Sequence, residues 1–220
     1  MQYLLKIPPG APTREIGVVG LRRLIVVTGT PGVGKTTTSE LVARKLCAVH
    51  INCSDLAVRK KLTIKYDDRA QSYIVDMDKL AALVKKIIRK SSTDIILEGH
   101  MVPIISGFEP SIVIVPRCHP KLLALRMKQK RYAKRKIAEN VAAEVLDVCL
   151  KEATDSYGIK KTYELDVTGK GRFEVASSML MILKGKKALR HRHVDWIQRL
   201  ESENKLEEIL VFIESGSRLM

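Results

Sequence analysis

Aromatic residues are scarce in this 220-residue sequence: they make up 5% of the chain, with one tryptophan. Proteins that recognise single-stranded RNA by stacking need several aromatic side chains on one surface. The scarcity therefore disfavours RNA recognition by base stacking. Any contact with RNA should be made mainly to phosphates and should weaken as salt is added.

Cysteines are also few, and no two of them form a C-x-x-C pair; they are Cys47, Cys53, Cys118 and Cys149. Structural zinc sites usually contain such pairs, so the sequence does not indicate zinc. Free thiols are typical of a protein that stays in a reducing compartment.

Long apolar runs are missing, since none approaches the ~18 residues needed to cross a bilayer. The first 22 residues lack the basic-then-apolar order of a secretory signal and contain two adjacent prolines. Arg22-Arg23 precede an apolar run, but that run continues directly into a glycine-rich loop, as a core strand does. We therefore expect a cytoplasmic protein without membrane contacts.

Acidic residues are absent between Glu109 and Glu139, and the whole chain carries a formal net charge of +15. Residues 121–136, "KLLALRMKQKRYAKRK", include eight basic residues. This balance favours polyanionic partners: nucleotides, RNA or a ribosomal environment. The basic run is either a solvated helix face or a cationic lid that closes over a phosphoryl group.

Apolar β-branched runs alternate with helical patterns along most of the chain. The predicted strands are 24–29, 48–52, 94–99, 111–116 and 162–167. The predicted helices between them are 35–46, 76–90, 120–130 and 133–156, the last with an apolar stripe from Ile137 to Leu146 and Cys149. This alternation predicts an α/β fold in three layers, with a five-stranded parallel sheet flanked by helices. Ligands should bind outside the carboxyl ends of the strands.

The strongest motif is "GTPGVGKTTT", residues 29–38, which lies between a predicted strand and a predicted helix. Its Gly29-x-x-x-x-Gly34-Lys35-Thr36 pattern is that of a phosphate loop, whose main-chain N–H groups point at a phosphate cluster. We expect Lys35, as an exposed loop residue, to reach the β- and γ-phosphates of a nucleoside triphosphate. Thr36 should bind Mg²⁺, and Thr37 should contact the α-phosphate.

A second candidate site follows the strand in "DIILEGH", residues 94–100. Glu98 at the tip of this strand can accept hydrogen bonds from the waters around Mg²⁺, or it can be a solvated strand end. His100 is either a catalytic residue or an ordinary loop histidine. The chain has no Asn-Lys-x-Asp segment, which disfavours a GTPase, and it lacks the length and motifs of a helicase or motor.

Six stretches resemble, in this order, the adenylate kinase isoenzyme 6 family: "VTGTPGVGKTT", "INCSDLA", "YIVDMDKL", "ILEGHMVP", "RYAKRKIAENVAAEVLDVCLKEA" and "YELDVTGK". That family includes the eukaryotic coilin-interacting nuclear ATPase and archaeal proteins named as adenylate kinases. The resemblance covers about residues 24–183. It implies an adenylate-kinase-like fold with a short lid, and phosphoryl transfer from ATP to a nucleoside monophosphate, chiefly AMP, together with ATPase activity.

The resemblance also implies a role in late maturation of the small ribosomal subunit, through a small-subunit ribosomal protein and pre-rRNA. By position, the residues implied to bind ATP are Gly32, Gly34, Lys35, Thr36 and Thr37. The implied organisation is an N-terminal extension (1–22), a kinase domain (23–185) with a monophosphate-binding segment (about 52–75) and a lid (about 129–139), and a C-terminal helical extension (186–220).

Two positions depart from the family pattern. The lid reads Lys130-Arg131-Tyr132 where related sequences usually read Arg-Gly-Tyr, so either Lys130 or Arg131 is expected to bind ATP and shield the transferred group. Lysine cannot make the planar two-pronged contact of arginine, and the loss of glycine stiffens the hinge. Val58, followed by Arg59, stands where related sequences carry arginine, which leaves the contact with the monophosphate open.

Three functions are therefore open. The first is a Mg²⁺-dependent monophosphate kinase that also hydrolyses ATP, in which Glu98 acts on the metal through water and His100 orients the acceptor or the attacking water. The second is an ATPase assembly factor for ribosomes with little kinase activity, and the third is a kinase for a sugar or shikimate. The amphipathic segment 193–214, "HVDWIQRLESENKLEEILVFIE", should pack on the sheet or bind a partner.

Overall fold

The computed structural model describes residues 22–67, 72–185 and 194–215. Nearly all of the expected N-terminal extension (1–21) lies outside the described residues. The same holds for part of the monophosphate-binding segment (68–71) and for two parts of the C-terminal extension (186–193 and 216–220).

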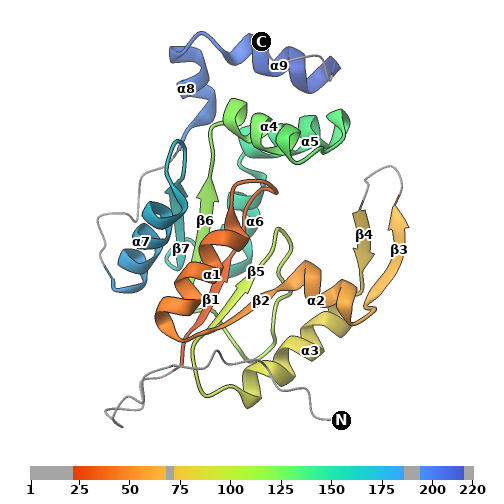
Figure 1. Ribbon diagram of the computed structural model, residues 1–220, viewed down its shortest axis with the longest axis vertical. Coiled ribbons are helices and arrows are strands. Elements are labelled where there is room, and N and C mark those ends of the chain that lie inside the picture. Colours follow the sequence, from red (N-terminus) through yellow and green to blue (C-terminus); the bar gives the residue numbers. More distant parts are fainter. Residues whose placement is uncertain (1–21, 68–71, 186–193, 216–220) are drawn as a thin grey trace.

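Five short strands form one parallel sheet, as the sequence predicts (Figure 1). They are β1 (Leu24–Val27), β2 (Val49–Asn52), β5 (Ile95–Glu98), β6 (Ile112–Arg117) and β7 (Thr162–Asp166), in the order β2-β5-β1-β6-β7. Because all pairings in this sheet are parallel, the carboxyl ends of the strands meet at one edge. The loop after the central strand β1 therefore lies between the loops that follow β5 and β6.

Helices cover both faces of the sheet, which confirms the three-layer α/β fold (Figure 1). Alternate residues of β1 enter the two cores: Ile25 and Val27 lie in one, Leu24 and Val26 in the other. The helices of the first core include α1 (Lys35–Leu46), α4 (Pro120–Gln129), α5 (Lys134–Val145) and α7 (Arg172–Leu183). Those of the second are α2 (Cys53–Arg59), α3 (Met77–Lys90) and α6 (Val148–Tyr157).

The prediction of one helix over 133–156 is wrong, because the helix is interrupted between α5, which ends at Val145, and α6, which begins at Val148. Asp147 adopts a left-handed conformation with φ of 57°. The guanidinium of Arg117 donates from Nη2 to the carbonyl oxygen of Glu144 at 2.9 Å and to the Asp147 carboxylate. These tertiary contacts stabilise the break, and α6 crosses to the other face of the sheet. Leu146 is consequently exposed rather than part of an apolar stripe.

The segment between α2 and α3 forms a separate antiparallel pair, β3 (Thr63–Asp67) and β4 (Ser72–Val75), which the sequence did not predict. Tyr66 and Tyr73 face each other across this pair with ring centroids 5.0 Å apart. The hairpin stands away from the main sheet, at the right of Figure 1.

Two C-terminal helices, α8 (Trp196–Ser202) and α9 (Leu206–Ser215), complete the described fold. Leu200, Ile209 and Phe212 join the first hydrophobic core, and α9 lies against α5. The amphipathic segment therefore packs on the helices above the carboxyl edge of the sheet rather than on the sheet itself (Figure 1). In the part of the chain that the structure describes, no helix combines the length and apolarity needed to cross a bilayer.

Candidate functional site

The glycine-rich loop joins β1 to α1 and leaves the start of α1 free of any side-chain cap. Gly34 precedes the helix with φ of 104°, a conformation that glycine adopts without strain. At Gly32, an added Cβ atom would lie 2.9 Å from side-chain atoms of both Leu123 and Met127, so α4 packs directly against the loop. The helix N-terminus and the loop together form a site for an anion.

Lys35 is buried, contrary to the expectation of an exposed lysine. Its Nζ atom donates to the carbonyl oxygens of Gly29 at 2.7 Å and Thr30 at 3.1 Å, so the ammonium lies within the curve of the loop. Burial lowers the pKa of Lys35 to about 8, although the charge of Glu98 acts in the opposite direction. A phosphate bound by the loop would compensate this charge.

Glu98 lies at the end of β5 and is buried, so it is not a solvated strand end. Its Oε1 atom accepts a hydrogen bond from Thr36 Oγ1 at 2.9 Å, and its Oε2 atom lies 3.1 Å from His50 Nε2. Asn52 Nδ2 lies 3.3 Å from the same Oε2 atom. Among the described residues, no lysine or arginine forms an ion pair with Glu98.

The oxygen atoms of Thr36 and Glu98 suit Mg²⁺, which prefers hard oxygen ligands and usually keeps several waters. Nucleotide-bound Mg²⁺ needs only one or two protein side chains. The absence of a cluster of three His, Cys, Asp or Glu side chains in the described residues is compatible with such a site. When bound, Mg²⁺ would neutralise charge on the β- and γ-phosphates.

His100 follows Gly99 in the loop after β5, and its carbonyl oxygen accepts a 3.3 Å hydrogen bond from Thr28 Oγ1. Its side chain reaches solvent, yet the surrounding protein lowers its pKa, and the charges of Lys35 and Lys136 add to this effect. His100 is therefore neutral near pH 7 and can accept a proton or a hydrogen bond.

The turn that was predicted to belong to a lid lies between α4 and α5, and its two candidate cations, Lys130 and Arg131, are exposed. Lys130 is close enough to the loop for its charge to lower the pKa of Lys35. Arg131, one of these two cations, adopts φ of 60° in the left-handed region. A non-glycine residue in this conformation costs about 1 kcal/mol, so the turn carries backbone strain at Arg131.

Thr36 and Thr37 are exposed at the start of α1, where a ligand can reach them. In the segment expected to bind the monophosphate, Val58 and Arg59 are both exposed on α2, and Arg59 Nε donates to Asp55 O at 3.3 Å. Arg59 therefore lies on the surface, and within the described part of the chain it bonds to its own helix.

Sequence reasoning missed several residues that surround the loop. Arg126, on α4, donates from Nη1 to Val33 O at 3.3 Å, so one basic side chain of the 121–136 run bonds directly to the loop. His50 and Asn52 could have been found, because they alternate with apolar residues in the strand "AVHIN" and so share one side of it.

A second buried glutamate, Glu144 of α5, also contacts the loop. Its Oε2 atom accepts a hydrogen bond from Thr30 Oγ1. Its Oε1 atom accepts from Arg117 Nε at 2.9 Å and from the main-chain N–H of Cys118 at 3.0 Å. Arg117 also forms an ion pair with Glu164 at 2.5 Å. No local motif in the sequence marks this network.

These features define a P-loop kinase-type fold. The sheet is parallel, a glycine-rich loop follows its central strand, a lysine lies inside that loop, and a carboxylate ends the adjacent strand. The family model described as an AAA domain matches residues 25–147. The chain is 36% identical over 179 residues to a "Putative adenylate kinase" of Thermococcus onnurineus, covering 81% of this chain and 93% of that protein.

A protein of the same name from Pyrococcus furiosus is 36% identical over 193 residues, covering 88% of this chain and 98% of the relative. The chain therefore belongs to this family of adenylate-kinase-like proteins, which confirms the resemblance seen in the sequence. Among solved structures, a gluconokinase from Sinorhizobium meliloti is similar, with 18% identity, a TM-score of 0.49, and coverage of 74% of this chain and 92% of that one.

Proposed function

We propose that this protein is a Mg²⁺-dependent nucleoside monophosphate kinase that converts ATP and AMP to two ADP and also hydrolyses ATP. The observation that carries this proposal is the pairing of Lys35, bonded inside the loop, with a buried Glu98 that is bonded to Thr36. The names of its archaeal relatives support the same activity.

In this proposal the N–H groups of the loop, including Gly32 and Gly34, hold the phosphates of ATP. Lys35 exchanges its bonds to the loop carbonyls for the β- and γ-phosphate oxygens. Thr36 would bind Mg²⁺, Glu98 would act on the metal through water, and Thr37 would contact the α-phosphate. The main contribution of the protein is to place the reactants and neutralise charge, without a covalent intermediate.

A phosphate oxygen of AMP attacks the γ-phosphorus of ATP, and the bond to the β,γ-bridging oxygen breaks as ADP leaves. Lys130 or Arg131 shields the transferred group, and neutral His100 orients the acceptor, or a water molecule when ATP is hydrolysed. We place the kinase domain at residues 23–185, with the monophosphate-binding segment at about 52–75 and the lid at about 129–139. The two C-terminal helices share its core.

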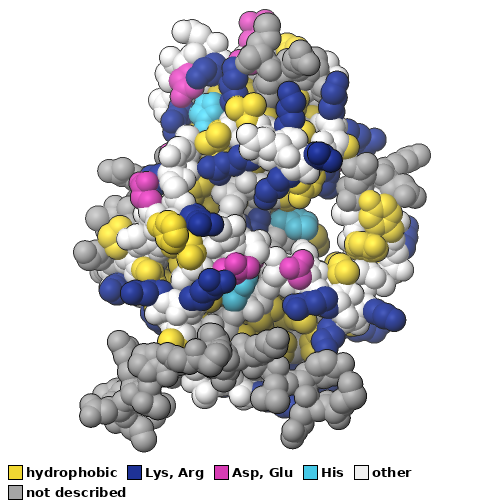
Figure 2. Space-filling view, viewed as in Figure 1, with side chains coloured by type: hydrophobic (Ala, Val, Ile, Leu, Met, Phe, Trp, Pro, Cys, Tyr) yellow, Lys and Arg dark blue, Asp and Glu magenta, His cyan; other side chains and the backbone are white. Residues whose placement is uncertain are grey.

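A cytoplasmic ATPase that assists assembly of the small ribosomal subunit is the second candidate. Its support is the net charge of +15 and the many Lys and Arg side chains spread over the face shown in Figure 2. Such a protein would contact a ribosomal protein or rRNA phosphates in a salt-dependent way. Its binding to purified small-subunit particles should change with ATP, and indifference to ATP would argue against it.

ADP formation from MgATP should be compared with AMP, CMP, GMP, UMP or no acceptor, with a sugar and shikimate as further acceptors. We expect AMP to give the largest increase over ATP alone. Equal rates with and without every monophosphate would remove the kinase proposal and leave the ATPase. A Lys35→Ala preparation gives the background from contaminating enzymes.

A further inference from the structure

Helix α8 inserts one side chain into the buried network beside the phosphate loop. Trp196 is 1% exposed and is the single tryptophan of the chain. Its Nε1–H donates to Glu144 Oε1 at 3.0 Å. The Arg117 guanidinium lies 5.9 Å from the centre of its ring. The indole therefore contacts both members of the buried Arg117–Glu144 ion pair.

Glu144 connects this indole to the loop. Its second oxygen accepts the hydroxyl of Thr30, and the carbonyl oxygen of Thr30 accepts the Lys35 ammonium at 3.1 Å. Three consecutive contacts thus lead from Trp196 through Glu144 and Thr30 to Lys35. All four residues are buried, so water does not compete with these bonds.

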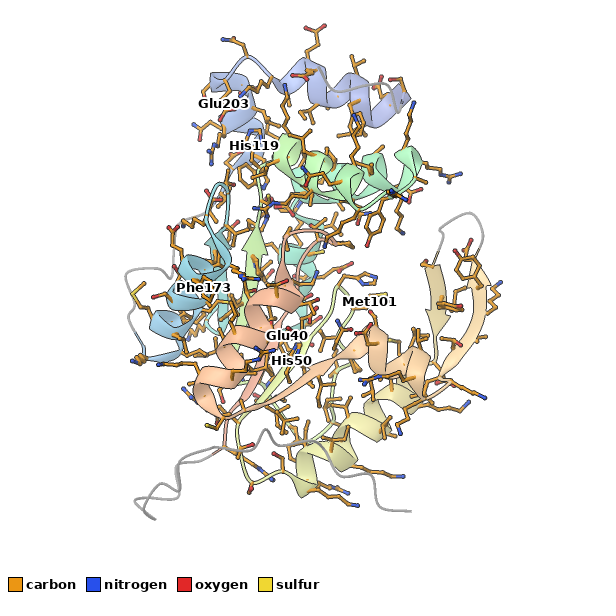
Figure 3. The ribbon with its side chains drawn as sticks, viewed as in Figure 1. Glu40, His50, Met101, His119, Phe173 and Glu203 are labelled. Carbon is orange, nitrogen blue, oxygen red and sulfur yellow. The ribbon has the colours of Figure 1, made fainter. Side chains whose placement is uncertain are left out.

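Other contacts hold α8 in place without the indole N–H. His119 and Glu203 face each other where α4 and α8 meet (Figure 3), with Nε2 and Oε2 3.1 Å apart. Arg199 forms an ion pair with Asp166 at 3.2 Å, and Leu200 is fully buried. Because these anchors lie at the carboxyl ends of β6 and β7, α8 should keep its position when only the N–H is removed.

We propose that Trp196 is a positioning residue for the phosphate loop: through Glu144 it fixes Thr30 and so maintains the loop shape that receives the triphosphate. The proposal rests on the proposed function only in requiring that the loop bind MgATP. It gives the C-terminal helices a role in nucleotide binding that acts through the shape of the loop.

The variant Trp196→Phe keeps an aromatic ring and removes the N–H. We expect its Kd for MgATP, measured by calorimetry, to rise about threefold to tenfold, as the loss of one buried hydrogen bond to a charged group allows. The control Leu200→Ala creates a cavity in α8 without removing a bond of the network. It should lower Tm more than Trp196→Phe does and leave Kd nearly unchanged. If Kd rises in proportion to the loss of Tm in both variants, Trp196 is only structural and the proposal is wrong.

A double-mutant cycle tests the route through Thr30. Once Thr30→Val has removed the hydroxyl, adding Trp196→Phe should raise Kd little further. Fully additive effects on the free energy of binding would overturn the proposed route. The tryptophan fluorescence of the unmodified protein should also change on saturation with MgATP, and an unchanged spectrum would contradict the coupling.

Calorimetry on the unmodified protein separates the two proposals. Absence of MgATP binding would refute the proposed function itself. Normal MgATP binding by the unmodified protein and equal binding by Trp196→Phe would refute only the role of Trp196.

Discussion

Two glutamates contact the phosphate-loop motif, Glu98 from the end of β5 and Glu144 from α5, and both are almost completely buried: Glu98 is 2% exposed and Glu144 is 1% exposed. Their partners differ. Glu144 forms an ion pair with Arg117, whereas the described contacts of Glu98 come from Thr36, His50 and Asn52. One carboxylate is compensated by a guanidinium, and the other has no lysine or arginine paired with it in the described residues.

This difference indicates that Glu144 stabilises the fold, whereas Glu98 is available to a bound cation. A buried carboxylate without a cation costs several kcal/mol, and that cost falls when a cation arrives. Glu98 therefore gains from Mg²⁺ or from rearrangement of Lys35, whereas Glu144 already has its partner. Lys35 lies near both, since the charges of Glu98 and Glu144 each raise its pKa against the effect of burial.

Removal of the shared lysine should have the largest effect. Lys35→Ala should lower kcat by about 10³-fold or more, because it removes the main cation that stabilises the transferring phosphoryl group. Tm should change little, since the lost carbonyl bonds are offset by the burial cost of the ammonium. Steady-state ADP formation and calorimetric melting measure the two effects.

Lys45→Ala, at an exposed position of the same helix, is the control and should leave kcat unchanged. Turnover by Lys35→Ala at the wild-type rate would contradict the site.

Neutralising Glu98 should mainly reduce activity, whereas neutralising Glu144 should mainly reduce stability. Glu98→Gln should lower kcat about 100-fold and weaken the response to Mg²⁺, with little loss of stability. Glu144→Gln should cost about 3 kcal/mol of unfolding free energy, because it removes the charge that pairs with Arg117. Denaturant unfolding and a Mg²⁺ titration of activity measure both quantities. A larger loss of stability in Glu98→Gln than in Glu144→Gln would break the distinction.

The pH dependence of MgATP binding should report the buried lysine. In the free protein the pKa of Lys35 is about 8, so the ammonium is mostly present below that pH and mostly lost above it. Because the triphosphate binds the ammonium form, binding above pH 8 requires proton uptake, and Kd should rise by up to about tenfold per pH unit. Calorimetry between about pH 7 and about pH 9 in buffers of different ionisation enthalpy measures both effects. Lys35→Arg should show no such rise, since arginine stays protonated.

The smallest effect should come from a donor to Glu98. His50→Leu removes the contact at Oε2 and should lower kcat about fivefold, as the loss of about 1 kcal/mol of orienting hydrogen bond predicts. Val49→Ala, on the opposite side of β2, is the control for general disturbance of the strand. Equal losses of kcat in the two variants would show that His50 does not orient Glu98.

Local patterns predicted the features that depend on neighbouring residues. The five apolar runs match the observed strands within two residues, and the predicted helix 35–46 coincides with α1. The loop and Glu98 were predicted for the same reason. Each is marked by a pattern of neighbouring residues, the glycine spacing in one case and the end of an apolar strand in the other. The break before α6 was missed because Arg117, far away in sequence, stabilises it.

The network around Glu144 could not be predicted from the sequence. The partners of Glu144 are far from it in the sequence: Arg117 is 27 positions away, Trp196 is 52 and Thr30 is 114. A glutamate within an amphipathic helix is usually solvated, and only the three-dimensional fold shows that this one is buried. By contrast, the alternation of His50 and Asn52 with apolar residues was a readable signal.

The break at Asp147 has a mechanical consequence. Helix α5 has 12 residues, so it is a rod about 18 Å long. Arg117 clamps its far end, and the lid turn is attached to its near end. At that length, a rotation of about 10° around the clamp would carry the lid end through about 3 Å, roughly one hydrogen-bond distance. A small adjustment at the Arg117 contact would therefore be enough to make or break contacts of the turn predicted to be a lid.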